Sequence, residues 1–98
     1  MTTKRKEKFN DVVFKFIDAH VDLYGYINVS VLSELFGIHR TSASGLLARY
    51  KELKPSNLEY VLQGTNSRYV KRFSFEKVVL KSESSIFLNS IYLVYEND

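Results

Sequence analysis

A short turn, Gly37-Ile38-His39, separates two segments of helical periodicity and limits the possible folds more than any other feature. Before the turn, Val29–Phe36 places apolar residues on one helical face, and Asn28 is a good N-terminal cap. After the turn, helical spacing continues from about Thr41 to Leu53, just before a proline that ends the helix. Two helices joined by a short glycine-containing turn are typical of a helix-turn-helix motif.

The segments on either side of this motif predict the rest of the domain. Largely apolar positions from Phe9 onward recur at intervals of three and four residues, which predicts a helix from about Glu7 to Leu23, ended by Gly25 in a left-handed conformation. Residues 57–62 and 68–73 alternate in polarity around a turn at 63–67, as in a β-hairpin. A hairpin directly after a helix-turn-helix is a wing. We therefore predict a mainly helical α+β fold, a winged helix-turn-helix.

The end of the chain is ambiguous between helix and strand. Residues 82–95 open with capping residues and place apolar side chains on one helical face, but their Ile, Val and Tyr content favours strand. We favour a C-terminal helix in addition to the three helices and the wing. The predicted organisation is a flexible basic tail over 1–8, the winged domain over 9–80 and a C-terminal dimerisation segment over 81–98.

The positive charge is concentrated in three segments. The chain has 14 Lys or Arg against 11 Asp or Glu, a formal net charge of +3. Residues 1–8, 37–55 and 64–77 each carry +3, so the remainder carries −6. One cluster alone could simply solubilise an exposed face. Three clusters on the tail, the second helix of the motif and the wing match the places where a winged helix touches a DNA duplex, and this favours DNA as the partner.

The dimensions of the grooves select candidate contact residues. A major groove admits one helix, so exposed residues early in the second helix of the motif can reach base edges, and Arg40 is the best candidate for pairing with guanine. Gly45 allows close approach of the helix backbone. Lysines and arginines farther along contact phosphates, and the wing tip enters the minor groove. The predicted DNA-binding residues are Arg40, Thr41, Ser42, Ser44, Gly45, Arg49, Lys51, Asn66, Ser67, Arg68 and Lys71.

Other classes of function find little support. The sequence has no Cys, two His, no phosphate-binding loop and no metal-ligand spacing, so we predict no enzyme, no cofactor, no metal and no small-molecule ligand. A Ser-x-x-Lys match at 74–77 is of a length that is common by chance. His20 falls on the apolar stripe of the first helix and is expected to be a core residue. No apolar run could cross a bilayer and no signal peptide is evident, which predicts a cytoplasmic, nucleoid-associated protein.

A more specific pattern runs from Val21 to Phe75. It comprises Tyr24-Gly25-Tyr26-Ile27-Asn28, Leu35-Phe36-Gly37-Ile38, Ala43-Ser44, Leu47, Tyr50-Lys51-Glu52-Leu53, Pro55-Ser56-Asn57-Leu58-Glu59-Tyr60 and Tyr69-Val70. This pattern resembles the N-terminal winged helix-turn-helix of WYL-domain transcriptional repressors, in particular the group that guards phage-defence operons of the BREX and CBASS type. The resemblance implies a homodimer that binds an inverted-repeat operator, with the recognition helix in the major groove and the wing alongside.

The resemblance also implies roles for individual residues. By position, it assigns DNA contacts to Arg40, Thr41, Ser42, Ser44 and Arg49 and to the wing around Asn66–Lys71. The segment from Ser84 aligns with the helix that leaves the wing and begins the dimer connection. We therefore expect a symmetric dimer interface formed by Phe14, Val21, Ile86, Phe87, Ile91, Leu93 and Val94.

The sequence departs from the family pattern at three points. His39 stands where family members usually have Ser, a better helix cap. Leu46 stands where they commonly have Asp, and is expected to pack inward. The sequence stops before any WYL domain, which leads us to expect that the ligand-sensing module is missing. An alternative function therefore remains open, a protein-binding winged helix that acts as an antirepressor or decoy by pairing with a full-length regulator.

Overall fold

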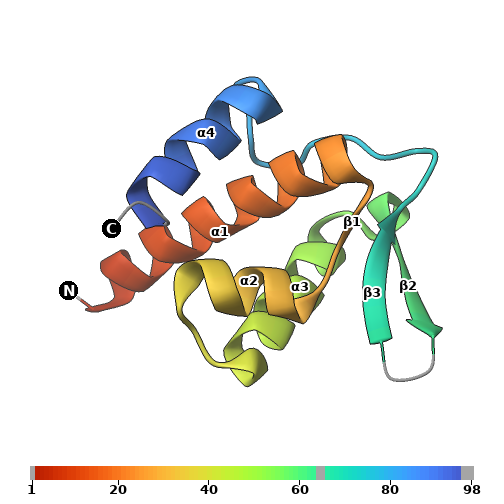
Figure 1. Ribbon diagram of the computed structural model, residues 1–98, viewed down its shortest axis with the longest axis horizontal. Coiled ribbons are helices and arrows are strands. Elements are labelled where there is room, and N and C mark those ends of the chain that lie inside the picture. Colours follow the sequence, from red (N-terminus) through yellow and green to blue (C-terminus); the bar gives the residue numbers. More distant parts are fainter. Residues whose placement is uncertain (1, 64–65, 96–98) are drawn as a thin grey trace.

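The computed structural model describes residues 2–63 and 66–95. The elements in chain order are α1 (Thr2–Tyr24), β1 (Tyr26–Ile27), α2 (Val29–Phe36), α3 (Arg40–Leu53), a 3-10 turn η1 (Pro55–Asn57), β2 (Leu58–Gln63), β3 (Asn66–Lys71) and α4 (Ser84–Tyr95). Figure 1 shows α1 in the middle, with α4 on one side, α2 and α3 on the other, and the hairpin beside them. The predicted mainly helical winged helix-turn-helix with a C-terminal helix is confirmed.

The core forms around α1. Val13, Phe16 and Ile17 are almost completely buried, and Phe16 meets Phe36 of α2 edge-on at 5.5 Å between ring centroids. Leu47 of α3 is also fully buried in this cluster. Burying each large apolar side chain contributes about 1.5–3 kcal/mol. The helix-turn-helix is therefore held as a unit against α1.

Local capping fixes the turn of the motif. Asn28 Oδ1 accepts a hydrogen bond from the Val31 N–H at 2.9 Å and begins α2, and Gly37 ends it with a φ of 65°. Gly25 ends α1 in the same left-handed region, with a φ of 82°. These caps were predicted. His39 makes no side-chain cap, and α3 begins at Arg40, one residue before the predicted start.

The sheet has one more strand than the predicted hairpin. Strands β2 and β3 pair antiparallel with Tyr60 opposite Tyr69, and β1 pairs with β3 through Tyr26 opposite Val70. The strand order is β1-β3-β2. The turn predicted at 63–67 is shorter, because β2 extends to Gln63 and β3 begins at Asn66. Its centre, residues 64–65, lies outside the described residues.

The predicted flexible tail is wrong as a description of residues 2–8. Helix α1 begins at Thr2, well before the expected Glu7, and includes the basic residues from Lys4 to Lys8. Lys, Arg and Glu are good helix formers, so the apolar stripe that begins at Phe9 can be extended by a charged first segment. The basic segment is therefore attached to the domain as helix.

A buried carboxylate joins three parts of the fold. Asp18 of α1 is fully buried, and its oxygens accept hydrogen bonds from the backbone N–H groups of Val78, Val79 and Leu80 at 2.6–3.0 Å. The Tyr50 hydroxyl of α3 is the fourth donor to this carboxylate. Burial, together with this hydrogen bond and the Asp18 charge, raises the pKa of Tyr50 above its ordinary value. The segment that leads into α4 thus depends on Asp18.

A second buried polar residue gives a pH-dependent stability. His20 packs against the rings of Phe16, Tyr24 and Tyr26, and its Nδ1 lies 2.8 Å from the Tyr26 carbonyl oxygen. A carbonyl can only accept, so Nδ1 carries the proton. Burial lowers the pKa of His20 below 6.5, and the hydrogen bond to Tyr26 offsets this only in part.

We expect the domain to lose stability as the pH falls from 7.5 to 5.5. His20 has its ordinary pKa in the unfolded state and a lower pKa in the folded state, so at low pH the unfolded state binds a proton more readily. The contribution of His20 to the stability is therefore present above its unfolded pKa and is lost as the pH falls below it. The measurement is the thermal midpoint at several pH values for the wild type and for His20→Gln. A smaller pH dependence in the variant is expected, and equal pH dependence in both proteins would contradict the assignment.

Candidate nucleic-acid interface

Helix α3 has an inward face and a face with small side chains directed to solvent. The inward face carries the buried residues Ala43, Leu46, Leu47 and Tyr50. At 100° per residue the opposite side carries Thr41, Gly45 and Ala48, which are all exposed. We call these three residues the recognition stripe. Its side chains are short, so another molecule can approach the helix backbone closely.

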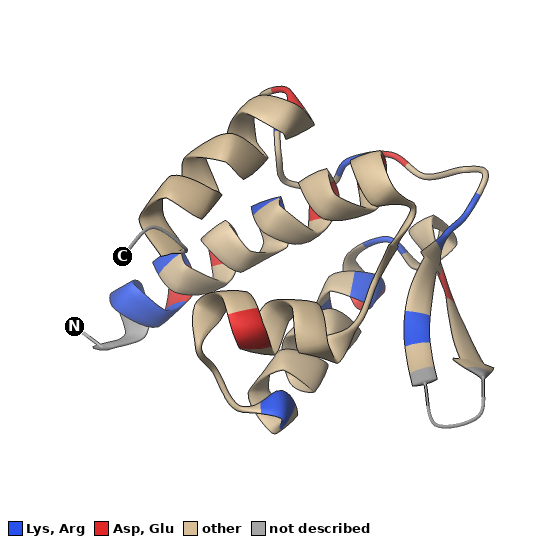
Figure 2. Cartoon of the chain, viewed as in Figure 1, with Lys and Arg blue, Asp and Glu red and all other residues tan. Residues whose placement is uncertain are grey.

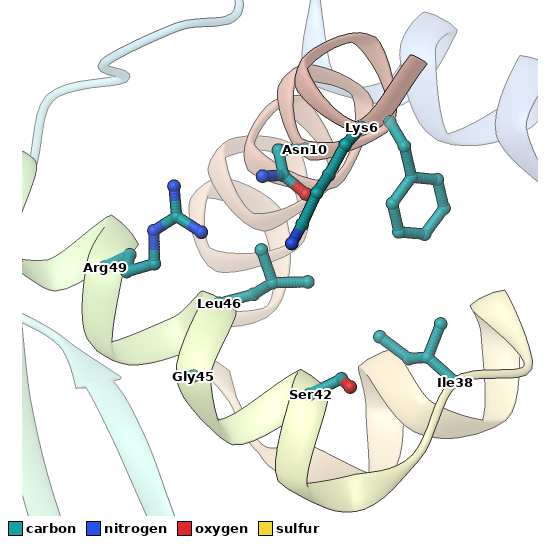
Figure 3. A pocket seen from close by; sticks show the side chains of 8 residues that line it. Lys6, Asn10, Ile38, Ser42, Gly45, Leu46 and Arg49 are labelled. Atoms are coloured by element: carbon teal, nitrogen blue, oxygen red, sulfur yellow. The ribbon is translucent and has the colours of Figure 1, made fainter. Parts of the chain in front are cut away.

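One flank of the recognition stripe faces α1. Ser42 and Arg49 of α3 line a hollow of about 300 Å³ together with Lys6 and Asn10 of α1. Figure 3 shows Lys6 and Asn10 pointing toward α3, with Arg49 across from them and Leu46 below. Leu46 is only 7% exposed, so it packs inward as expected.

Lys6 is a functional candidate that the sequence reasoning did not single out. The residue had been placed in the predicted tail, but within α1 it lies one helical turn from Asn10 and faces Arg49 across the hollow. The signal available in the sequence was the spacing of Lys6, Phe9 and Asn10, which is that of one helical face. The α1 flank therefore carries two cations.

The other flank faces the wing. Arg40 Nη1 donates to Ser30 Oγ of α2 at 2.8 Å, and the Arg68 guanidinium of β3 lies 5.9 Å from the centroid of the Tyr26 ring. Both arginines line one hollow of about 290 Å³ with Ser67. Ser44 lines an adjoining hollow with residues of the wing, Tyr60, Ser67 and Tyr69. Arg40, Ser44, Ser67 and Arg68 are thus brought together.

Two lysines of the basic segments, one of them the predicted contact Lys71, are engaged within the chain. The Lys71 amine donates to the Asp22 carbonyl at 3.1 Å and lies 3.8 Å from the Asp22 carboxylate. Lys54 forms an ion pair with Glu76, and the hydrogen bond between their side chains lowers the pKa of Glu76. Lys51 is half-buried in the last turn of α3. Of these lysines, Lys71 is therefore less available to DNA than its position in the wing implies.

The distribution of charge follows this arrangement. Figure 2 shows Lys and Arg at the start of α1, at both ends of α3 and on β3. Helix α4 contains no charged residue. The charged and the uncharged surfaces of the domain are therefore carried by different elements.

The predicted dimer residues divide into two groups. Ile86, Leu93 and Val94 of α4 are 60%, 68% and 72% exposed. Val21 and Ile91 are buried, at 0% and 7% exposure, because α1 and α4 pack against each other within one chain. Their assignment to a dimer interface was wrong. Phe14 is half-buried against Tyr50, and Phe87 is half-buried against the core.

Residues 2–63 and 66–95 contain no group of three or more His, Asp or Glu placed to hold a metal ion. Over the same residues, no helix has both the length and the apolar character needed to cross a membrane.

Comparison with known proteins gives two findings. Residues 10–92 match the family model described as the winged helix-turn-helix domain of the BrxR transcriptional regulator. Two curated relatives, each named DNA-binding transcriptional repressor CapW, come from Escherichia coli and from Escherichia coli strain KTE188. Each is 36% identical over 80 residues, which is 82% of this chain and 26% of the relative. The chain thus spans about a quarter of the length of these relatives.

Proposed function

The chain belongs to the BrxR winged helix-turn-helix family of transcriptional regulators, and from this premise we propose that it is a sequence-specific double-stranded DNA-binding repressor. The observation that carries the proposal is the recognition stripe with a pair of cations on each flank, Lys6 and Arg49 toward α1, Arg40 and Arg68 toward the wing. Following the resemblance, we propose that its target genes belong to phage-defence operons, and that it acts in the cytoplasm at the nucleoid.

The proposed mode of binding follows from the groove. A major groove about 12 Å wide admits one helix, and the phosphates of the two strands line its edges. The recognition stripe would enter the groove, where Thr41 can hydrogen-bond to base edges. The cations on the two flanks would then meet the two backbones. Phosphate contacts supply affinity, and base contacts supply specificity.

We further propose that the regulator is a homodimer that binds an inverted repeat. The support is α4, an uncharged helix that leaves Ile86, Leu93 and Val94 exposed next to one another at helical spacing. Two-fold symmetry would pair this face with itself and place two recognition helices in successive major grooves. The half-sites would then lie about 10 base pairs apart or a multiple of that.

Leu93→Glu is expected to convert the dimer to a monomer without unfolding it. The charge would be desolvated in a symmetric apolar interface but free in the monomer, where Leu93 is 68% exposed. Sedimentation at tens of micromolar measures the change, with circular dichroism to show that the helices remain. Ser85→Glu, an exposed position at the start of α4, is the control. A wild type that is monomeric at this concentration would contradict the proposal.

The experiment that tests the function is selection from a random duplex library. Bound duplexes recovered at low salt are expected to share one motif, arranged as an inverted repeat. No enriched motif would overturn the proposal and favour the alternative, a winged helix that binds protein.

A further inference from the structure

We infer that the hollow between Arg40 and Arg68 binds one backbone phosphate of the DNA, so that Arg40 positions the recognition helix and does not read a base. The inference rests on the proposed DNA binding and assigns a ligand to one part of that surface. It changes the role of the residue that the sequence favoured for contact with guanine.

The position of Arg40 directs it away from the recognition stripe. It is the first residue of α3, and its Nη1 donates to Ser30 Oγ of α2 at 2.8 Å. Around the helix axis it falls on the same side as Ser44, four residues on, which faces the wing. To reach a base edge below the stripe, the guanidinium would have to leave Ser30.

Arg68 approaches the same hollow from the sheet. It lies on β3 opposite Val61 of β2, and its guanidinium lies over the Tyr26 ring of β1. Ser67, the preceding residue, contributes to the lining as well. Helix α3, strand β3 and the start of α2 therefore converge on one hollow of about 290 Å³.

The charges in this hollow are unbalanced. Both arginines line it, no carboxylate does, and among the ion pairs of residues 2–63 and 66–95 neither arginine has an acidic partner. A guanidinium has five N–H donors. Arg40 uses one of them in its hydrogen bond to Ser30. Phosphate oxygens fit the forked geometry of guanidinium groups and would neutralise both charges at once.

A single phosphate held in this way would have a mechanical consequence. It would join the first turn of the recognition helix to the wing, two elements that carry different contacts with the duplex. Because phosphate contacts set register and orientation, the depth at which the recognition stripe sits in the groove would depend on this hollow.

The test compares variants on the selected operator and on a scrambled duplex. Arg40→Ala and Arg68→Ala are each expected to weaken binding about tenfold per protomer on both duplexes, since a hydrogen-bonded charge contributes about 1.5 kcal/mol. Each variant should also lower the salt dependence by about one phosphate contact. Because both arginines hold the same phosphate, their effects should not be additive. The loss of affinity in the double variant should be smaller than the product of the losses in the two single variants.

A scan with single methylphosphonates, which are uncharged, identifies the phosphate. At one phosphate per half-site, the methylphosphonate should weaken binding of the wild type about tenfold and have little further effect on binding of Arg40→Ala or Arg68→Ala. Arg49→Ala, the control on the other flank, should remain sensitive to this methylphosphonate. The inference is overturned if Arg40→Ala removes the preference at one base pair and matches no methylphosphonate. It is equally overturned if inorganic phosphate alone saturates the hollow and no methylphosphonate has an effect. A wild type that binds no duplex would instead refute the proposed function.

Discussion

Replacing Asp18 with Ala is expected to lower the free energy of unfolding by about 3–5 kcal/mol, the cost of removing one partner from a buried charged network. The change leaves three backbone N–H groups, those of residues 78–80, and the buried Tyr50 hydroxyl without their acceptor. A domain of this size is stable by about 5–15 kcal/mol, so the variant should be close to unfolding.

Urea denaturation of Asp18→Ala measures this loss, and Asp11→Ala is the matched control. Asp11 is exposed and pairs with Lys15 on the same helix at 3.0 Å, so its replacement should cost about 0.5 kcal/mol or less. Asp18→Asn keeps the shape but offers one acceptor oxygen in place of two, so we expect an intermediate loss. Equal stability of the Asp18→Ala and Asp11→Ala variants would refute the role given to this carboxylate.

The second large effect is expected on DNA affinity without a loss of stability. A Cβ built at Gly45 meets nothing within 4 Å and Gly45 is exposed, so Gly45→Leu is accommodated in the free domain, and Leu is a better helix former than Gly. Gly45 lies at the centre of the recognition stripe, where a bulky side chain would hold the helix away from the base edges. We expect affinity for the selected operator to fall about 100-fold, which is about 2.7 kcal/mol.

A size series separates steric exclusion from other causes. Gly45→Ala should stabilise the domain by about 1 kcal/mol and raise the thermal midpoint by about 4–8 °C, with a smaller loss of affinity than Leu causes. Ser85→Leu adds the same bulk at an exposed site on α4 and should bind DNA normally. Binding of Gly45→Leu with the affinity of the wild type would show that the recognition stripe does not enter the groove.

The helices and their caps could be predicted from the sequence because their signals are local. Asn28 caps a helix that begins at the next residue, and Gly25 and Gly37 adopt left-handed conformations where the apolar periodicity stops. The hairpin was predictable from alternation, although its turn was placed two residues too long on the β3 side. The pairing of β1 with β3 could not be predicted, because a two-residue extended segment has no signal for a partner far along the chain.

The errors arise where distant segments meet. Val21 was assigned to a dimer interface, which requires an exposed position, but it is buried because α1 packs against elements on both sides (Figure 1). The backbone partners of Asp18 lie about 60 residues away, and nothing near Asp18 in the sequence indicates them. Lys71 was expected to be free for phosphate, but Asp22 of α1 engages its amine.

The sequence could predict which helices and strands carry the cations of the candidate site, but not which cations lie together on one flank of the recognition stripe. Charge counting placed cations on α3 and the wing, and these do flank the recognition stripe. Which cations share a flank depends on the side of α3 that faces each neighbouring element. Lys6 lies near Arg49 because the basic segment is helical. Arg40 lies near Arg68 because α2 packs beside the wing.

The most direct test of the account is the salt dependence of binding to the selected operator, measured beside a scrambled duplex from 50 to 300 mM salt. Lys6 and Arg49 contact one phosphate each and Arg40 and Arg68 share a third, so a dimer should show a slope of about −5 for the logarithm of affinity against the logarithm of salt concentration. The operator should be preferred throughout. A slope near zero, or equal affinity for the two duplexes at every salt concentration, would contradict the proposal that this domain reads DNA sequence through α3.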